Sequence, residues 1–218
     1  MAHVITFSSL KGGVGKSTLS MNVAAYLALA KHRVLLVDTD PQGTCVAWSA
    51  CAADAGRDQP SPVVVAMPGS VLRRDLPTIA KGFDVVVVDS PPRLGLEARS
   101  AMLVADVVLI PVTPGAADVW AAKETVMVLE DAKGLRPDLR AAVILNRADR
   151  TTFTRHAAKA IEALGVLPMD VSVGQRVAFR EATLEGQGVT GYAPKSDAAH
   201  EIRRLTRSIF DVIGGASA

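Results

Sequence analysis

Two groups of residues in this 218-residue sequence have the types and spacing to act on phosphate groups. The first is the segment 11–18, where two lysines frame three glycines and a Ser-Thr pair follows. The second consists of aspartates that directly follow apolar runs, namely Asp38, Asp40 and Asp89. Glycine-rich turns, lysines and strand-end carboxylates together are typical of sites that bind a nucleotide with Mg²⁺.

The segment 11–18 lies between an apolar run at 4–7 and an alanine-containing run at 19–27, which predicts a strand, a turn and the start of a helix. Backbone N–H groups of such a turn, with the positive end of the helix dipole, form a cradle for phosphate oxygens. Lys16 would then reach the terminal phosphates, and the Ser17 hydroxyl would ligate Mg²⁺. The nucleotide-binding residues predicted here are Lys11, Gly12, Gly13, Val14, Gly15, Lys16, Ser17 and Thr18.

The aspartates end runs that read as buried parallel strands. Four consecutive valines precede Asp89, and a carboxylate at the end of such a strand is costly unless it is paired or faces a cation. This is the Walker-B pattern, in which Asp89 would hold a water of the Mg²⁺ shell; the alternative is a helix-capping aspartate. Asp38 and Asp40 would reach the same edge of the sheet, although an Asp-rich turn before Pro and Gly can also be only a turn or cap.

The wider pattern alternates short apolar runs with amphipathic segments. Strands are predicted at 4–7, 33–37, 63–66, 83–88, 106–112 and 141–145, and helices at 19–27, from 44, at 70–80, 116–132, 150–164 and 197–213. This alternation predicts an α/β fold, a doubly wound and mostly parallel sheet with helices on both faces. The length suits a single nucleotide-binding domain covering 1–218.

Composition limits the remaining classes of protein. The sequence has a net charge of +2, so affinity for DNA has to come from local clusters of basic side chains. It shows neither an apolar run long enough to span a membrane nor a secretory signal, so we expect a cytoplasmic protein. Cys45 and Cys51 match neither a disulfide framework nor a zinc spacing, and are expected to be small core or surface residues.

The segment 11–18 departs from G-x-x-x-x-G-K-[ST] in an informative way, because Leu10 stands in place of the first glycine and Lys11 follows it. The pattern K-G-G-x-G-K-[ST] resembles the ParA/MinD family of deviant Walker-A ATPases, and the segment 106–114 resembles its small plasmid-type, ParF-like members in particular. The resemblance implies a homodimer with ATP sandwiched between the subunits, in which Lys11 reaches the partner's nucleotide. It also implies that Asp40 positions the attacking water and that Asp38 lies near the Mg²⁺ shell. Lys11, Lys16 and Asp40 are therefore the expected catalytic residues.

The resemblance also indicates a base-binding region. In the family, an asparagine at the end of the corresponding strand bonds the adenine edge, which here is Asn146, and a loop after the next strand covers the base. That loop would be 167–170, with Pro168 and Met169 against the base. The segment 146–149 is also close to the N-K-x-D pattern of guanine-specific proteins, so guanine stays open as an alternative; the lysine-rich loop favours adenine.

The C-terminal region decides which surface the protein binds. On the predicted helix at 197–213, apolar residues form one stripe, and Arg203, Arg204 and Arg207 fall nearly opposite. Outward arginines suit contacts with DNA phosphates, and Arg176 lies in a segment that resembles the DNA-contacting region of the family. The alternatives are an ordinary solvated helix face and an interfacial membrane anchor, the latter weakened by Asp211.

Together these features predict a ParA-type ATPase that dimerises around Mg-ATP and binds double-stranded DNA non-specifically at the nucleoid. A ParB-like or other adaptor protein would stimulate hydrolysis, and the cargo would be DNA or a protein assembly. A MinD-like ATPase acting on a membrane surface is the main alternative. A metal-cluster scaffold is disfavoured by the lack of a C-x-x-C pair, and a P-loop kinase would need an acceptor pocket that the sequence does not indicate.

Overall fold

The structure is a computed structural model that describes residues 2–56, 59–92, 95–149, 157 and 159–214. The strands are β1 (His3–Phe7), β2 (Val34–Asp38), β3 (Val63–Ala66), β4 (Val85–Asp89), β5 (Val107–Val112), β6 (Arg140–Ala148), β7 (Leu167–Pro168) and β8 (Val173–Gly174). The helices are α1 (Lys16–Leu29), α2 (Thr44–Asp54), α3 (Gly69–Ile79), α4 (Leu96–Leu103), α5 (Ala116–Leu135), α7 (Val177–Leu184), α8 (Val189–Tyr192) and α9 (Asp197–Gly214). Most of the helix expected at 150–164 falls outside the described residues.

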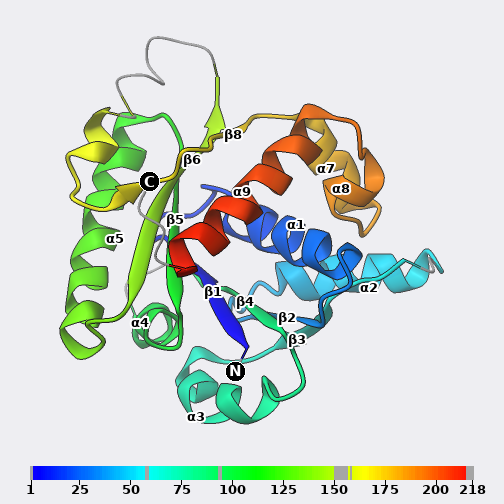
Figure 1. Cartoon of the computed structure of the whole chain (residues 1–218), viewed down its shortest axis with the longest axis horizontal. Coiled ribbons are helices and arrows are strands. Elements are labelled where there is room, and N and C mark those ends of the chain that lie inside the picture. The colour runs from blue at the N-terminus through cyan, green and yellow to red at the C-terminus, as the bar shows by residue number, and fades with distance from the viewer. Residues whose placement is uncertain (1, 57–58, 93–94, 150–156, 158, 215–218) are drawn as a thin grey trace.

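All of these strands belong to one parallel sheet. Its order is β3-β2-β4-β1-β5-β6-β7, and β8 also pairs with β6. The strand that leads into the glycine-rich loop, β1, therefore lies between β4 and β5 near the middle of the sheet (Figure 1). Because the strands are parallel, their carboxyl ends share one edge, where open α/β sheets bind ligands. The predicted α/β fold is confirmed.

Helices cover both faces of the sheet because successive strand residues point to opposite sides. On β2, Val34 and Leu36 pack with α1, α7, α8 and α9, whereas Leu35 and Val37 pack with α3. A third cluster joins α4 and α5 to the opposite half of the sheet through β5 and β6. Burial on both faces accounts for the unbroken apolar runs seen in the sequence.

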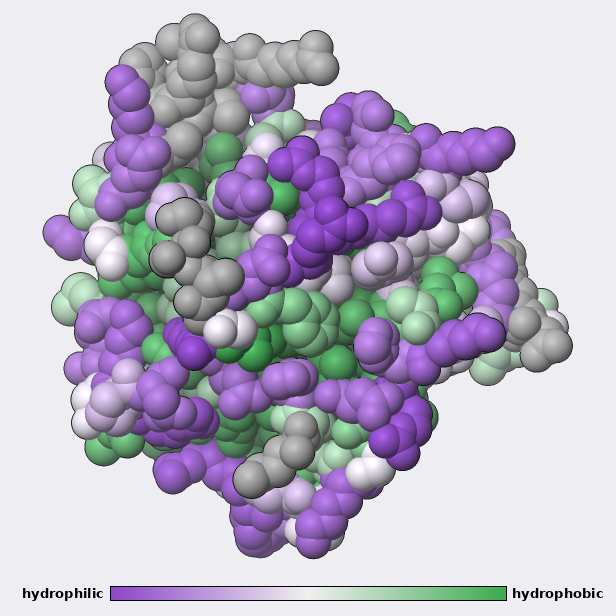
Figure 2. Space-filling view, in the orientation of Figure 1, coloured by the Kyte–Doolittle hydropathy of each residue, from purple (hydrophilic) through white to green (hydrophobic). Residues whose placement is uncertain are grey.

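Helix α9 is strongly amphipathic, as predicted. Ile202, Leu205 and Ile209 are fully buried against the sheet side. Arg204 and Arg207 are exposed on the other side. Figure 2 shows hydrophilic side chains gathered over α9 and α7 on this face of the molecule. None of the helices in the described part of the chain has the length and apolar content that crossing a bilayer requires.

Candidate nucleotide site

The loop between β1 and α1 has the backbone shape of a phosphate cradle. Gly13 and Gly15 have φ of 78° and 95°, values that favour glycine. Gly15 directly precedes α1, and a Cβ on it would overlap the side-chain amide of Asn146. The space beyond Gly13 is open, since nothing lies within 4 Å of where its Cβ would be. The loop therefore leaves room for a ligand at the positive end of α1.

Lys16 closes this loop from inside. It is the first residue of α1, it is 6% exposed, and its Nζ donates a hydrogen bond to the Lys11 carbonyl at 3.1 Å. Burial lowers the pKa of Lys16, while the nearby charges of Asp89 and Asp40 act in the opposite direction. An ammonium held in a buried position by a backbone oxygen is preorganised to meet phosphate oxygens.

Two buried aspartates stand side by side at the ligand edge, because Asp38 on β2 is in register with Asp89 on β4. Asp89 is fully buried, with Ser20 Oγ at 3.3 Å from one carboxylate oxygen and Cys45 Sγ at 3.5 Å from the other. Burial raises the pKa of Asp89 to about 6, and a hydrogen bond from Ser17 partly offsets that shift. Such a carboxylate is poised to be stabilised by a cation.

Asp38 has a different environment. One carboxylate oxygen accepts hydrogen bonds from the backbone N–H groups of Cys45 at 2.8 Å and Val46 at 3.3 Å, and the other accepts from Asp40 at 3.1 Å. Burial raises the pKa of Asp38, and these backbone donors act against the shift. The carboxylate thus caps the start of α2 and fixes the turn that carries Asp40, in addition to facing Asp89.

Asp38, Cys45 and Asp89 each place one potential ligand atom within 4.8 Å of the other two. Mg²⁺ prefers oxygen ligands, so the carboxylates and the nearby Ser17 hydroxyl suit this ion, whereas the Cys45 thiol does not. Burial raises the pKa of Cys45 far above its ordinary value, which leaves a neutral thiol beside the acids. Cys45 is a buried core residue and Cys51 is exposed, as expected of small core or surface residues, but the sequence did not indicate that Cys45 lies beside the two aspartates.

Asp40 lies half-buried in the turn between β2 and α2. One of its carboxylate oxygens accepts a hydrogen bond from the Gln42 backbone at 3.0 Å, and Gly43 donates to the Asp40 carbonyl at 2.9 Å. The carboxylate charge also acts on Lys16. The turn therefore holds Asp40 at the same edge as the glycine-rich loop.

Lys11 turns its side chain away from its own loop. Its ammonium forms an ion pair with Asp118 in the first turn of α5, and Asp118 in turn accepts a hydrogen bond from Thr113. Lys11 contributes its backbone carbonyl to the Lys16 contact described above. The local sequence pattern did not indicate Asp118, because its contact with Lys11 joins residues about a hundred positions apart.

A cavity of about 520 Å³ lies beside the loop. It is bordered by the start of α1, the end of β6 and the segment formed by β8 and α7, with Gly15, Thr18, Asn146, Arg147, Gln175 and Phe179 among its lining residues. Asn146 is 5% exposed and donates from Nδ2 to the Val14 carbonyl at 2.7 Å. Asn146 therefore links this cavity to the cradle. A larger cavity, of about 800 Å³, lies around His3, Arg73 and Arg140 at the opposite edge of the sheet.

Pro168 and Met169 do not line the cavity next to Asn146. Pro168 pairs with Val143, three residues before Asn146 on β6, and Met169 donates its N–H to the Val143 carbonyl at 2.9 Å. Met169 packs against the main core instead. The segment beside Asn146 is β8, where Val173 is its pairing partner. The placement thus does not support the expected contact of Pro168 and Met169 with a base, because the chain passes Asn146 several residues later than expected.

The basic residues proposed for DNA fall into two groups. Arg176 is held by Glu201 at 2.7 Å and by Asp197 at 3.4 Å, and hydrogen bonding to Glu201 raises its pKa. The sequence did not indicate this pairing, which arises because α9 brings its acidic first turns back to β8. Arg203, Arg204 and Arg207 form no ion pair with another described residue. They remain available on the outer side of α9.

Residues 5–189 match the family of CobQ/CobB/MinD/ParA nucleotide binding domains. The chain is 35% identical over 220 residues to the maintenance of carboxysome distribution protein A of Halothiobacillus neapolitanus, covering 96% of this chain and 97% of that protein. It is 29% identical to the chromosome-partitioning ATPase Soj of Thermus thermophilus, with 94% of each chain covered. By their names, these two relatives act in carboxysome distribution and in chromosome partitioning.

Solved structures share the fold at lower identity. Apo McdA of Cyanothece has a TM-score of 0.81 at 16% identity, covering 96% of this chain and all of that one. MinD of Pyrococcus horikoshii, solved with Mg-ADP, has a TM-score of 0.76 at 22% identity, covering 100% of this chain and 99% of that one. With the family match spanning most of the sequence, the chain belongs to the ParA/MinD family of P-loop nucleotide-binding proteins.

Proposed function

We propose that the protein is an ATPase that binds Mg-ATP in the loop between β1 and α1. Lys16 would contact the terminal phosphates, and Ser17 and Asp89 would hold Mg²⁺. Asp38, beside Asp89, would lie near the Mg²⁺ shell. When bound, Mg²⁺ would neutralise charge on the phosphates. Asp40 would orient the attacking water and accept its proton late in the reaction, since its turn places a carboxylate near Lys16.

We further propose that two copies enclose the nucleotide between them. The observation that carries this proposal is the position of Lys11, which belongs to the glycine-rich loop but whose ammonium points out of its own cradle towards α5. The side chain is 36% exposed, so it can reach beyond its own chain. Lys16 already supplies an ammonium to the phosphates in its own cradle, so a second lysine is not needed there. The ammonium of Lys11 would instead bind the phosphates of the nucleotide held by the partner.

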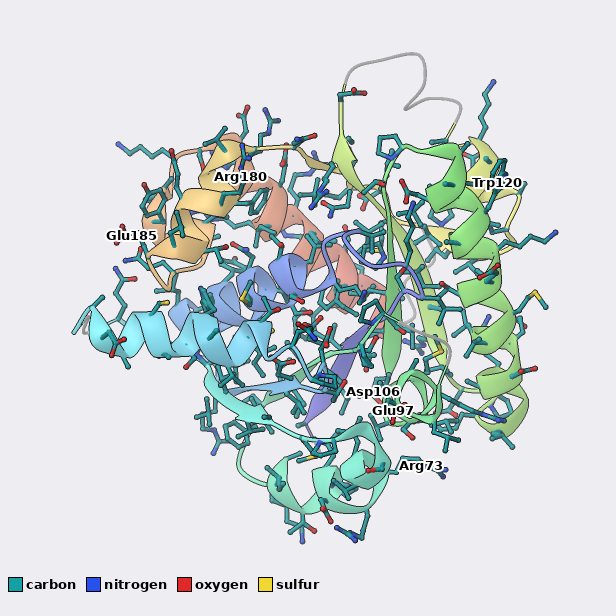
Figure 3. All side chains as sticks on the ribbon, turned by 180° about the vertical axis from the view of Figure 1, so that it is seen from behind. Arg73, Glu97, Asp106, Trp120, Arg180 and Glu185 are labelled. Atoms are coloured by element: carbon teal, nitrogen blue, oxygen red, sulfur yellow. The ribbon has the colours of Figure 1, made fainter. Side chains whose placement is uncertain are left out.

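The outer side of α9 is the proposed DNA surface. Arg203, Arg204 and Arg207 are spaced along one side of the helix, so they can follow a row of phosphates. Binding of this kind depends on charge and not on base sequence. Arg176 is left out of the proposed contact set because Glu201 and Asp197 already neutralise it, and Arg180 on α7, labelled in Figure 3, is the next candidate.

The proposed cargo is a carboxysome-like protein assembly or a chromosome, following the names of the relatives that cover nearly the whole chain. An adaptor protein attached to that cargo would stimulate hydrolysis and release the dimer from nucleoid DNA. Fluorescence anisotropy with a labelled 60-base-pair duplex of random sequence tests the DNA step with ATP, with ADP and without nucleotide, over a series of salt concentrations. ATP-dependent binding that weakens steeply with salt is expected.

The matched control is Arg73→Ala on α3, an exposed arginine outside the proposed contact set, which should leave DNA affinity unchanged. Affinity that does not depend on ATP would contradict the proposal. The same protein is also sedimented with anionic liposomes in the presence of ATP. If the protein sediments with liposomes but does not bind DNA, the proposed DNA surface would be wrong, and a membrane-binding surface of the MinD type would take its place.

A further inference from the structure

The side chain of Lys11 is held by a carboxylate that is itself held in place. Asp118 uses one oxygen for the Lys11 ammonium and the other for the Thr113 hydroxyl, and its side chain is only 16% exposed. The turn before α5 is shaped for this arrangement, because a Cβ on Gly115 would come within 2.5 Å of the Asp118 carboxylate. The contact is therefore part of the fold and not a chance encounter of two mobile side chains.

A second contact fixes the same part of the loop to α5. The backbone N–H of Leu10 donates to Thr125 Oγ1 at 3.2 Å, and Thr125 is fully buried and donates in turn to the Ala121 carbonyl at 3.0 Å. Leu10 and Lys11 are thus both bound to one helix, whereas the glycines that follow them are open to ligand. Helix α5 consequently fixes the position of Lys11 in the nucleotide-free chain.

We infer that Asp118 is a positioning residue for Lys11: it holds the ammonium against α5 in the single chain and must release it before Lys11 can enter a shared nucleotide site. This inference rests on the proposed function, in which Lys11 serves the partner's nucleotide. The phosphate oxygens of that nucleotide and the Asp118 carboxylate compete for the same ammonium. The strength of the Asp118 contact therefore sets part of the cost of forming the dimer.

The electrostatic surroundings make the exchange feasible. Burial acts to raise the pKa of Asp118, but hydrogen bonds from Lys11 and Thr113, with the charges of Lys11 and Arg147, outweigh it and leave the pKa lowered. The carboxylate is thus ionised in the single chain. Once Lys11 leaves, the Asp118 carboxylate still accepts the hydrogen bond from Thr113 and still lies near the charge of Arg147.

The first test measures Lys11 alone, without a dimer. Nucleotide-free protein is treated with a trace of acetic anhydride, and mass spectrometry gives the rate of acetylation at Lys11. We expect Asp118→Asn to raise this rate several-fold and Thr113→Val to raise it by less. Asp118→Glu should restore a rate near that of the wild type. The matched control, Asp131→Asn, removes the same charge from an exposed position on α5 and should have no effect.

The second test measures dimerisation by analytical ultracentrifugation with Mg-ATP. Two partly exposed ion pairs are broken for each dimer, so Asp118→Asn should tighten the dimer by about 5- to 30-fold. The effect should vanish when Lys11→Ala is added. Equal dimer affinities for Asp118→Asn and the wild type would overturn the inference, as would equal acetylation rates. If the wild type does not dimerise with ATP, the proposed function fails, while the acetylation rates still decide whether Asp118 holds Lys11.

Discussion

Replacement of Gly15 by alanine should damage the phosphate loop through two separable costs. At a φ of 95°, an L-residue is strained, which costs about 1–2 kcal/mol. The new Cβ would also overlap the Asn146 amide and displace it from the buried Val14 carbonyl, and a buried acceptor without its donor costs about 1–3 kcal/mol. We therefore expect Gly15→Ala to lower the free energy of unfolding by about 2–5 kcal/mol.

A double-variant cycle separates the two costs. In an Asn146→Ala background the overlap and the hydrogen bond are already gone, so Gly15→Ala should cost only the dihedral part, about 1–2 kcal/mol. Urea unfolding followed by circular dichroism, on the wild type, both single variants and the double variant, gives the coupling energy. Gly13→Ala is the matched control, because Gly13 also has positive φ but nothing lies near its Cβ position. Costs of Gly15→Ala and Asn146→Ala that simply add would refute the reasoning.

Three further predictions address the site and the surface. Lys16→Ala should abolish ATP binding in isothermal titration calorimetry, whereas Asp40→Ala should still bind ATP and accumulate as a dimer; normal hydrolysis by the Asp40 variant would exclude its assigned role. Burial raises the pKa of Asp89 to about 6, so the folded chain holds this proton more tightly than the unfolded chain. The free energy of unfolding, measured without nucleotide, should thus fall as pH rises towards and through about 6, and Asp89→Asn should flatten this part of the pH profile. Replacement of both Arg203 and Arg204 by alanine should weaken DNA binding on all sequences and reduce the salt slope by about 2 for each copy that contacts the DNA, and an unchanged slope would remove them from the DNA surface.

The parts of the site that lie within one strand-loop-helix unit could be predicted from the sequence. The glycine-rich loop follows β1 directly, and burial on both faces explains why the valines of β4 lead to a carboxylate at the ligand edge. Parallel strands bring their ends together, so Asp38 and Asp89 could be expected to meet without knowledge of any side-chain contact. Local pattern and sheet geometry are sufficient for such residues.

Contacts between distant units could not be predicted in this way. The Lys11–Asp118 pair and the Arg176–Glu201 pair depend on how helices dock, and that docking is decided by packing of apolar faces and not by the charged residues themselves. The base contact at Pro168 stays a prediction, and the path of the chain past Asn146 could not be predicted for a related reason. Very short strands such as β7 carry no periodic signal, so the position at which the chain passes Asn146 could not be fixed.

The central place of β1 in the sheet also affects how the protein comes to be active during its synthesis. His3 pairs with Val85, and Ile5 pairs with Val107, so the first strand waits for partners made about 80 to 100 residues later. Until the ribosome has released the chain beyond β5, β1 lacks one or both of the neighbouring strands that hold it and the loop after it in place. Nucleotide binding should therefore be a late event in folding, and a nascent chain that stops before β5 should not bind ATP.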